Sequence, residues 1–103
     1  MAKYTFEWDT GNLGHILQDY PERDNTLEEV ESVFYDPWVM IKLDRIVGEE
    51  KRFMALGEGI NGTVKVVIFT FRGESIRPIS CWKAKKKLKR MYYEARRKEE
   101  TRD

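Results

Sequence analysis

The chain has 103 residues, of which 41% are hydrophobic, 13% aromatic and 36% charged, with a formal net charge of +1. This length suits one domain over residues 1–103, with a frayed tail at about 99–103, and the hydrophobic content excludes a disordered protein. One histidine and one cysteine exclude an internal disulfide and the usual zinc sites, so we expect no metal and no other cofactor.

The first third of the chain predicts one strand and two helices. YTFEWD at 4–9 alternates apolar and polar residues, which is the period of a strand, and Asp9 or Thr10 can cap the helix that follows. The apolar residues of that helix recur at helical spacing and are Leu13, Ile16, Leu17 and Tyr20. After a turn at YPERDN, Thr26 and Glu29 form a capping box for a second helix, which Pro37 ends.

The middle of the chain changes to the period of strands. Four strands are predicted, separated by turns: WVMIKLDRI at 38–46, KRFMALGE at 51–58, TVKVVIFTFR at 63–72 and SIRPIS at 75–80. Because proline cannot donate a hydrogen bond, Pro78 places the last strand at a sheet edge or at a bulge.

The last segment predicts a helix from about Trp82. One side of it is apolar and should pack on the sheet: Cys81, Ala84, Leu88, Met91, Tyr92 and Ala95. The element order is therefore β-α-α-β-β-β-β-α, which favours an α+β fold with a mostly antiparallel sheet and helices to one side.

A second stripe of that helix is basic, with Lys86, Arg90, Tyr93 and Arg97 along it and Lys83 and Lys87 beside it. Residues 1–71 hold seven Lys/Arg and thirteen Asp/Glu, whereas residues 72–103 hold twelve and five. The balance changes from −6 to +7, which indicates either a positive face for an anionic partner or a helix whose lysines face water.

Four segments in order resemble the BrnT toxin family. They are FEWDTGNLGHI at 6–16, LEEVESVFYDP at 27–37, GEEKRFMALG at 48–57 and VVIFTFRGESIRPISCWKA at 66–84. The resemblance implies a compact RelE-like fold and a type II toxin that cuts RNA without a metal. It also implies a BrnA-like antitoxin partner, with operator DNA bound only through that antitoxin.

The chain departs from the family pattern at three places. LQDYPERDN at 17–25 replaces a Lys-His-Gly stretch, Trp82 replaces an arginine, and Leu88 replaces a glutamate. These changes remove basic residues and a carboxylate. A catalytically silent module of the same fold, binding nucleic acid or only the antitoxin, therefore stays open as an alternative.

The candidate catalytic residues follow from the chemistry of metal-free RNA cleavage, in which a ribose 2′-OH attacks the adjacent phosphate. Arginine suits stabilisation of the phosphorane, and Arg77, Arg72 and Arg52 stand on or beside predicted strands. His15 can take or give a proton near neutral pH. The candidate RNA-binding residues are Lys83, Lys86, Arg90, Tyr93, Arg97, Ser80 and Trp8.

Structural alternatives exist for the strongest of these candidates. Arg52 or Arg77 can instead pair with Glu7, Glu49 or Glu50 across strands. Trp8 can be a residue at the edge of the core, and His15 can be a solvated or helix-capping histidine. MAKYTFEWD lacks the apolar stretch of a signal peptide and no apolar run approaches ~18 residues, so we expect no membrane contact and a cytoplasmic location.

Overall fold

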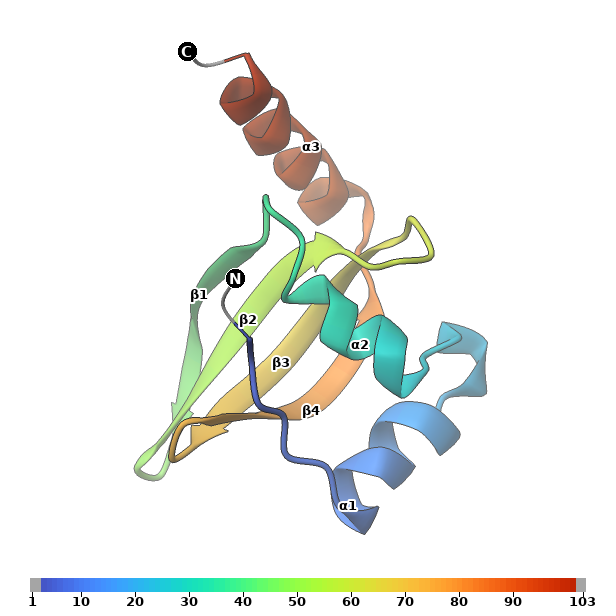
Figure 1. Ribbon diagram of the computed structural model, residues 1–103, viewed down its shortest axis with the longest axis vertical. Coiled ribbons are helices and arrows are strands. Elements are labelled where there is room, and N and C mark those ends of the chain that lie inside the picture. Colours follow the sequence, from blue (N-terminus) through green and yellow to red (C-terminus); the bar gives the residue numbers. More distant parts are fainter. Residues whose placement is uncertain (1–2, 102–103) are drawn as a thin grey trace.

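Four antiparallel strands form the centre of the protein and lie side by side in sequence order (Figure 1). The computed structural model describes residues 3–101. The strands are β1 (Met40–Val47), β2 (Glu50–Glu58), β3 (Val64–Arg72) and β4 (Ser75–Lys83). Two-residue turns at 48–49 and 73–74 join β1 to β2 and β3 to β4, and Gly48 and Gly73 take the positive φ values that such turns need. All four predicted strands are confirmed, and the last is three residues longer than predicted.

Short helical segments cover one face of this sheet, as Figure 1 shows. They are α1 (Thr10–Leu13), the π-helical η1 (Gly14–Gln18), the 3-10 turn η2 (Pro21–Arg23) and α2 (Leu27–Val33). Asp9 caps α1 by accepting from the backbone N–H groups of Gly11 and Asn12, as the sequence predicts. The core on this face consists of Ile16, Val30, Val33, Phe34, Ala55, Val67, Phe69, Ile76 and Cys81.

The strand predicted at 4–9 is wrong. This segment makes a single parallel bridge, between Phe6 and Ile76 of β4. The N–H of Glu7 donates to the carbonyl of Ile76, and the N–H of Ile76 donates to the carbonyl of Thr5. The alternation in the sequence reflects side-chain burial, because Phe6 and Trp8 pack against the core. The backbone of this segment pairs with β4 at this one bridge only.

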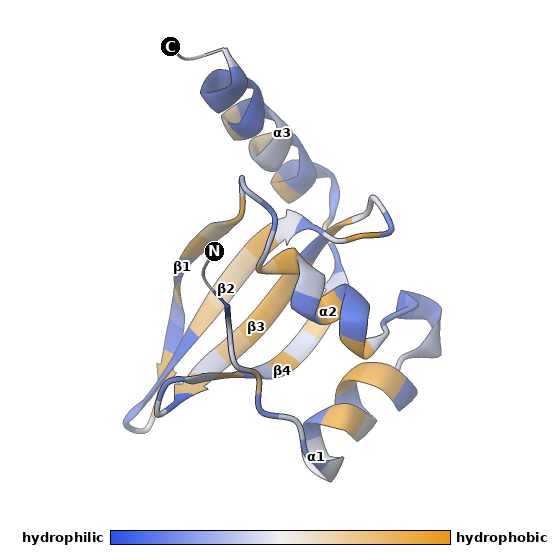
Figure 2. Cartoon of the chain, in the orientation of Figure 1, coloured by the Kyte–Doolittle hydropathy of each residue, from blue (hydrophilic) through white to orange (hydrophobic). Residues whose placement is uncertain are grey.

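The C-terminal helix α3 (Lys86–Glu100) begins four residues later than predicted, because β4 continues through Trp82 to Lys83. It packs on the face of the sheet opposite to α2, so the prediction of helices to one side is also wrong. Tyr92 is fully buried there, in a second core with Leu56, Val64 and Val66. Most of α3 is hydrophilic (Figure 2).

The predicted apolar stripe of this helix is confirmed only in part. Leu88 packs against the second core, whereas Met91 is 37% exposed and Cys81 belongs to β4. α3 remains helical through Glu100, so residues 99–100 of the predicted tail are ordered helix, and residues 102–103 lie outside the described residues. Tyr92 packs on the sheet and Arg96 pairs with Glu58 at the end of β2, while Ile79, Ser80 and Trp82 of β4 stay partly exposed.

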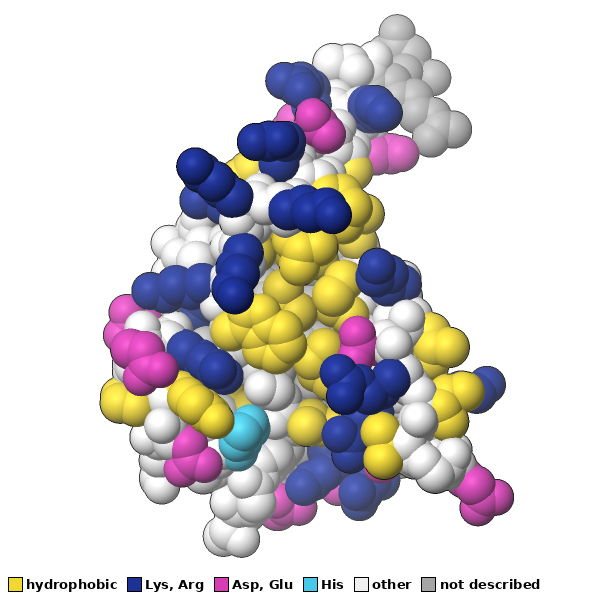
Figure 3. All heavy atoms as spheres, turned by 180° about the vertical axis from the view of Figure 1, so that it is seen from behind, with side chains coloured by type: hydrophobic (Ala, Val, Ile, Leu, Met, Phe, Trp, Pro, Cys, Tyr) yellow, Lys and Arg dark blue, Asp and Glu magenta, His cyan; other side chains and the backbone are white. Residues whose placement is uncertain are grey.

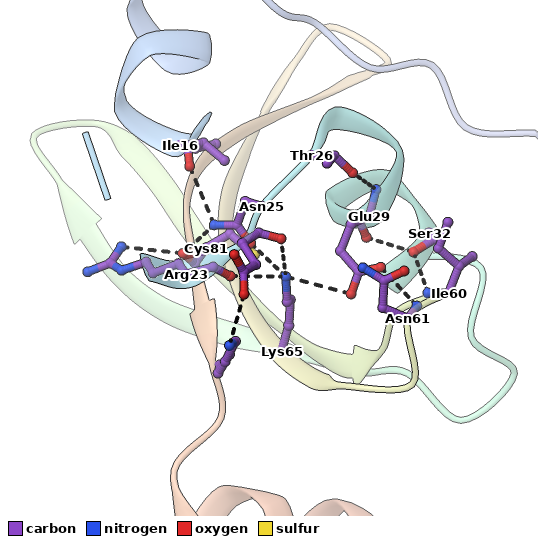
Figure 4. A network of polar contacts seen from close by, with 12 residues as sticks. Ile16, Arg23, Asn25, Thr26, Glu29, Ser32, Ile60, Asn61, Lys65 and Cys81 are labelled. Carbon is purple, nitrogen blue, oxygen red and sulfur yellow. Dashed lines mark hydrogen bonds and ion pairs between the residues drawn. The ribbon is translucent and has the colours of Figure 1, made fainter. Parts of the chain in front are cut away.

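A buried polar network fixes the loop before α2 against the sheet (Figure 4). Lys65 of β3 and Glu29 of α2 are 1% and 0% exposed, and their Nζ and Oε2 atoms are 3.6 Å apart. Lys65 also donates to Oδ1 of Asn25 at 2.8 Å, while Asn25 donates to the carbonyl of Cys81 at 2.9 Å. The network therefore ties the 23–25 loop to both β3 and β4.

Pro78 has the consequences that the sequence predicts. β4 is an edge strand of the four-stranded sheet, and its pairing with β3 shifts between Ile68 and Phe69, where Ile79 is the extra residue. Such a bulge bends a strand and re-aims its side chains. In this protein the bulged residue Ile79 lies between Arg77 and Ser80.

Candidate nucleic-acid interface

Three adjacent hollows lie along the edge strand β4, and together we call them the β4 groove. The first is lined by Gly11, Asn12, His15, Arg77, Pro78 and Ile79. The second is lined by Asp44, Arg45, Arg52, Met54, Ile68, Ile79, Ser80 and Trp82. The third is lined by Glu22, Arg23, Trp82, Lys83 and Lys85. Ile79 lines the first two hollows and Trp82 the last two, so each hollow adjoins the next along β4.

Figure 3 shows this side of the molecule from behind, with an apolar band across it and Lys and Arg side chains along its borders. The cross-strand register places three arginines on one face of the sheet. Arg45 pairs with Arg52, and Thr70 pairs with Arg77. Phe53 pairs with Phe69, so Arg52 and Thr70, one position further along, also share a face. Because residues opposite each other in an antiparallel pair point to the same face, Arg45, Arg52 and Arg77 project to one side of the sheet.

The first hollow brings His15 and Arg77 together from segments far apart in the sequence. His15 lies in η1, its side chain is 41% exposed, and Nδ1 is 3.6 Å from Oδ2 of Asp19. Its ring also meets Tyr20 edge to face at 5.3 Å. The sequence prediction that His15 is not buried is therefore confirmed.

Arg77 is held by two carboxylates from the N-terminal segment. Its Nη1 donates to Oδ2 of Asp9 at 2.6 Å and to Oε2 of Glu7 at 3.3 Å, and its Nη2 donates to Oδ1 of Asp9 at 3.2 Å. The hydrogen bond from Arg77 lowers the pKa of Asp9, and the same bond raises the pKa of Arg77. Among the described residues, the Nε–H and one Nη2–H of Arg77 have no hydrogen-bond partner, so two donors are left for a ligand.

Carboxylates also pair with the other two candidate arginines. Arg52 donates from Nε to Glu50 at 2.8 Å within β2, and Arg72 lies 3.6 Å from Glu7. The pairing alternative is thus realised for Arg77 with Glu7 and for Arg52 with Glu50, although the second pair lies within one strand. Arg52 lines the second hollow with Ser80, whereas Arg72 lines none of the three.

The third hollow is cationic and has an aromatic wall. The guanidinium of Arg23 lies 3.8 Å from the ring centroid of Tyr20 and 5.9 Å from that of Trp82. Lys83 is half exposed and lies 3.5 Å from a highly exposed Asp24 carboxylate, which is a weak, screened pair. The ammonium group of Lys83 therefore stays accessible to an anionic ligand.

Several predicted residues lie outside the groove. Trp8 packs against the core beneath α2 and donates from its indole N–H to Glu31 at 2.7 Å. Tyr93 is 40% exposed and donates to Glu58 at 3.3 Å. The remaining three are exposed on α3, which extends the basic surface beyond the sheet: Lys86, Arg90 and Arg97.

The sequence analysis did not predict that Arg23, Arg45 and Trp82 line the groove. Arg45 could have been identified from the sequence, because it lies on the strand that forms a hairpin with the strand of Arg52. Arg23 could not, because its position depends on the Asn25 and Lys65 network that folds the loop against β4.

Comparison with known protein families shows to which family the chain belongs. Residues 14–87 match the model of the BrnT ribonuclease toxins of type II toxin–antitoxin systems. The chain belongs to the BrnT family. A search of curated proteins finds no match.

Membership of the BrnT family confirms the resemblance seen in the sequence. The matched range contains the motifs at 27–37, 48–57 and 66–84 in full, and it begins within the motif at 6–16. A type II toxin has an antitoxin as its partner. Residues 3–101 contain no helix long and apolar enough to cross a membrane, and no group of three or more metal-ligating His, Cys, Asp or Glu side chains.

Proposed function

We propose that this BrnT family protein is an endoribonuclease that cuts RNA without a metal and holds its substrate in the β4 groove. The observation that carries the proposal is that the three hollows adjoin along β4, each sharing a lining residue with the next. This arrangement gathers His15, Arg52, Arg77, Ser80 and Lys83 along one path. A path lined by cations and an aromatic wall suits a single RNA strand, whose phosphates are anionic and whose bases stack.

The cleavage step needs a proton acceptor, a proton donor and stabilisation of the phosphorane. The ribose 2′-oxygen bonds to the adjacent phosphorus, and the bond from phosphorus to the 5′-oxygen breaks. The products are a 2′,3′-cyclic phosphate and a 5′-hydroxyl. His15 transfers one of the two protons, and the two uncommitted N–H groups of Arg77 bind the phosphate oxygens, with Arg52 and Ser80 further along the path.

The proposed protein partner is a BrnA-like antitoxin, and operator DNA is bound only through it. Support comes from the family, whose members act in type II toxin–antitoxin systems, and from the +7 balance of residues 72–103. An acidic antitoxin segment is complementary to that charge. Such a segment in the β4 groove would exclude RNA.

A catalytically silent module of the same fold is the second candidate. One observation favours it: the guanidinium groups of Arg77 and Arg52 are already paired with carboxylates. In addition, Leu88, at the position of the family's glutamate, packs into the second core and offers no carboxylate.

Cleavage of a bare RNA in excess EDTA distinguishes the two candidates. We expect cleavage to persist in chelator, to leave a cyclic phosphate, and to stop when the ribose before the cut lacks its 2′-OH. Loss of cleavage on chelation, with recovery on adding Mg²⁺ or Mn²⁺, would reject the metal-free mechanism. Binding of RNA without any cleavage, with a salt-dependent affinity, would identify the silent module.

A further inference from the structure

We propose that Trp82 is a base-stacking subsite, which holds one unpaired RNA base away from the cleaved bond. The inference rests on the proposed function and adds a residue that the family pattern does not supply, because the family has an arginine at this position. Trp82 lines both the second and the third hollow, so any strand that follows the groove passes its indole ring.

The indole ring is held rigidly. Trp82 lies near the end of β4, opposite Val66 of β3, and one side of it packs against the second core. A side chain on a strand with a packed base loses little freedom when a ligand binds, which favours stacking. The remainder of the ring faces the groove.

Charged groups stand around the ring at positions that suit the phosphates of the stacked nucleotide. Lys83 and Lys85 share the third hollow with it, and the Arg23 guanidinium is 5.9 Å from its centroid. Arg23 is fixed by its stack on Tyr20 and by a hydrogen bond from Nη1 to the carbonyl of Cys81 at 3.3 Å. An aromatic face beside fixed cations is the arrangement by which proteins bind single strands.

The other two tryptophans do not offer such a surface. Trp8 packs against the core and its N–H is committed to Glu31. Trp38 lines a separate hollow beside α3, and the Arg96 guanidinium lies over its ring at 4.3 Å, closer than the 5.9 Å between the Arg23 guanidinium and the Trp82 ring. Trp38 therefore serves as the matched control for Trp82.

The subsite lies away from the reacting phosphate. Trp82 is five positions after Arg77 on the same strand, with one bulge between them, which corresponds to roughly 13–17 Å along β4. That length spans a few nucleotides. The stacked base therefore sets how the strand is held, and the proton transfers take place at the other end of the groove.

The test uses a single-stranded RNA octamer with 2′-O-methyl riboses, which cannot be cut, and the same octamer lacking its bases. Tryptophan emission and affinity are measured for the full protein and for Trp82→Ala, Trp82→Phe and Trp38→Phe. We expect the wild type and Trp38→Phe to bind the octamer about 10- to 100-fold more tightly than the abasic strand. We expect Trp82→Ala to lose that difference, and Trp82→Phe to keep part of it.

Quenching should depend on Trp82 in the same way. Saturation with the octamer should quench the emission of wild type and Trp38→Phe, but not that of Trp82→Phe. The subsite would be overturned if the wild type bound the octamer and the abasic strand equally, or if the octamer quenched Trp82→Phe as much as the wild type. The wild-type comparison decides the question even if Trp82→Ala fails to fold. If base-dependent binding occurs but native RNA is never cut, the nuclease proposal fails and the subsite stands.

Discussion

The guanidinium of Arg77 donates to both carboxylate oxygens of Asp9, at 2.6 and 3.2 Å. Asp9 is also the N-cap of α1, the turn that leads into His15. This one pair therefore joins β4 to the segment that carries the candidate proton-transfer group. Because Arg77 is both an ion-pair partner of Asp9 and a proposed phosphate ligand, separate variants are needed to distinguish the two roles.

Replacing Arg77 tests the phosphate contact. We expect Arg77→Ala to lower single-turnover RNA cleavage by about 10²–10³, beyond any loss of folded protein, because one preorganised charge is removed from the phosphorane. Arg77→Lys should not restore full activity, since the planar fork is lost. The measurement is cleavage and thermal unfolding on the same preparations.

Asp9→Asn is the matched control for that experiment. Asparagine is as good an N-cap as aspartate, so α1 should be retained while the charged pair with Arg77 is lost. Cleavage should fall much less than in Arg77→Ala. Equal losses in the two variants would show that Arg77 acts only through its pair with Asp9.

The pair also predicts how stability changes in acid. Because the hydrogen bond from Arg77 lowers the pKa of Asp9 in the folded protein, the pair stabilises the fold above the unfolded pKa of aspartate, about 3.9. That contribution is lost as the pH falls through the lower, folded-state pKa. The difference in Tm between wild type and Asp9→Asn should be constant from neutral pH to about 5 and shrink below about 4. A difference that persists to pH 2 would contradict this origin.

The buried pair of Lys65 and Glu29 should be the most sensitive polar contact in the fold. Lys65→Met leaves the Glu29 carboxylate buried without its cation, which we expect to cost about 3–5 kcal/mol in urea unfolding. The double variant Lys65→Met, Glu29→Met should lose much less than the sum of the single changes. Lys42→Met, on the exposed β1, is the control and should stay within about 0.5 kcal/mol. A loss below about 1 kcal/mol for Lys65→Met would mean that water reaches Glu29.

The salt dependence of RNA affinity tests whether the basic stripe of α3 contacts phosphates. Changing Lys86, Arg90 and Arg97 to Gln should flatten the slope of log affinity against log salt by up to roughly 2, at about 0.7 per phosphate contact on a single strand. The melting temperature should hardly change, because all three are exposed. The control variant Lys3→Gln, Lys51→Gln should keep the wild-type slope. If the α3 variant keeps it too, the stripe is an ordinary solvated helix face.

Local chemistry in the sequence determined the elements of this protein. Alternating residues and glycine turns predicted the positions of β1 to β4. Pro78 predicted an edge strand or a bulge, and Asp9 was one of two residues predicted to cap the first helix. These features depend on neighbours within a few residues, which a sequence pattern records directly. The family motifs likewise lie within continuous segments, and the match over 14–87 confirmed them.

Only the tertiary structure decided which side chains meet. The segment at 4–9 has the pattern of a strand, yet β4 accepts it at one bridge, because the chain turns away at once into α1. The sequence pattern predicts a helix from about Trp82, yet Trp82 lies within β4, because its pairing with Val66 extends the strand. Whether Arg77 meets Asp9, and whether Trp82 stands beside Arg23, depends on contacts between residues more than fifty positions apart. Local propensity carries no information about such contacts, and packing settles them.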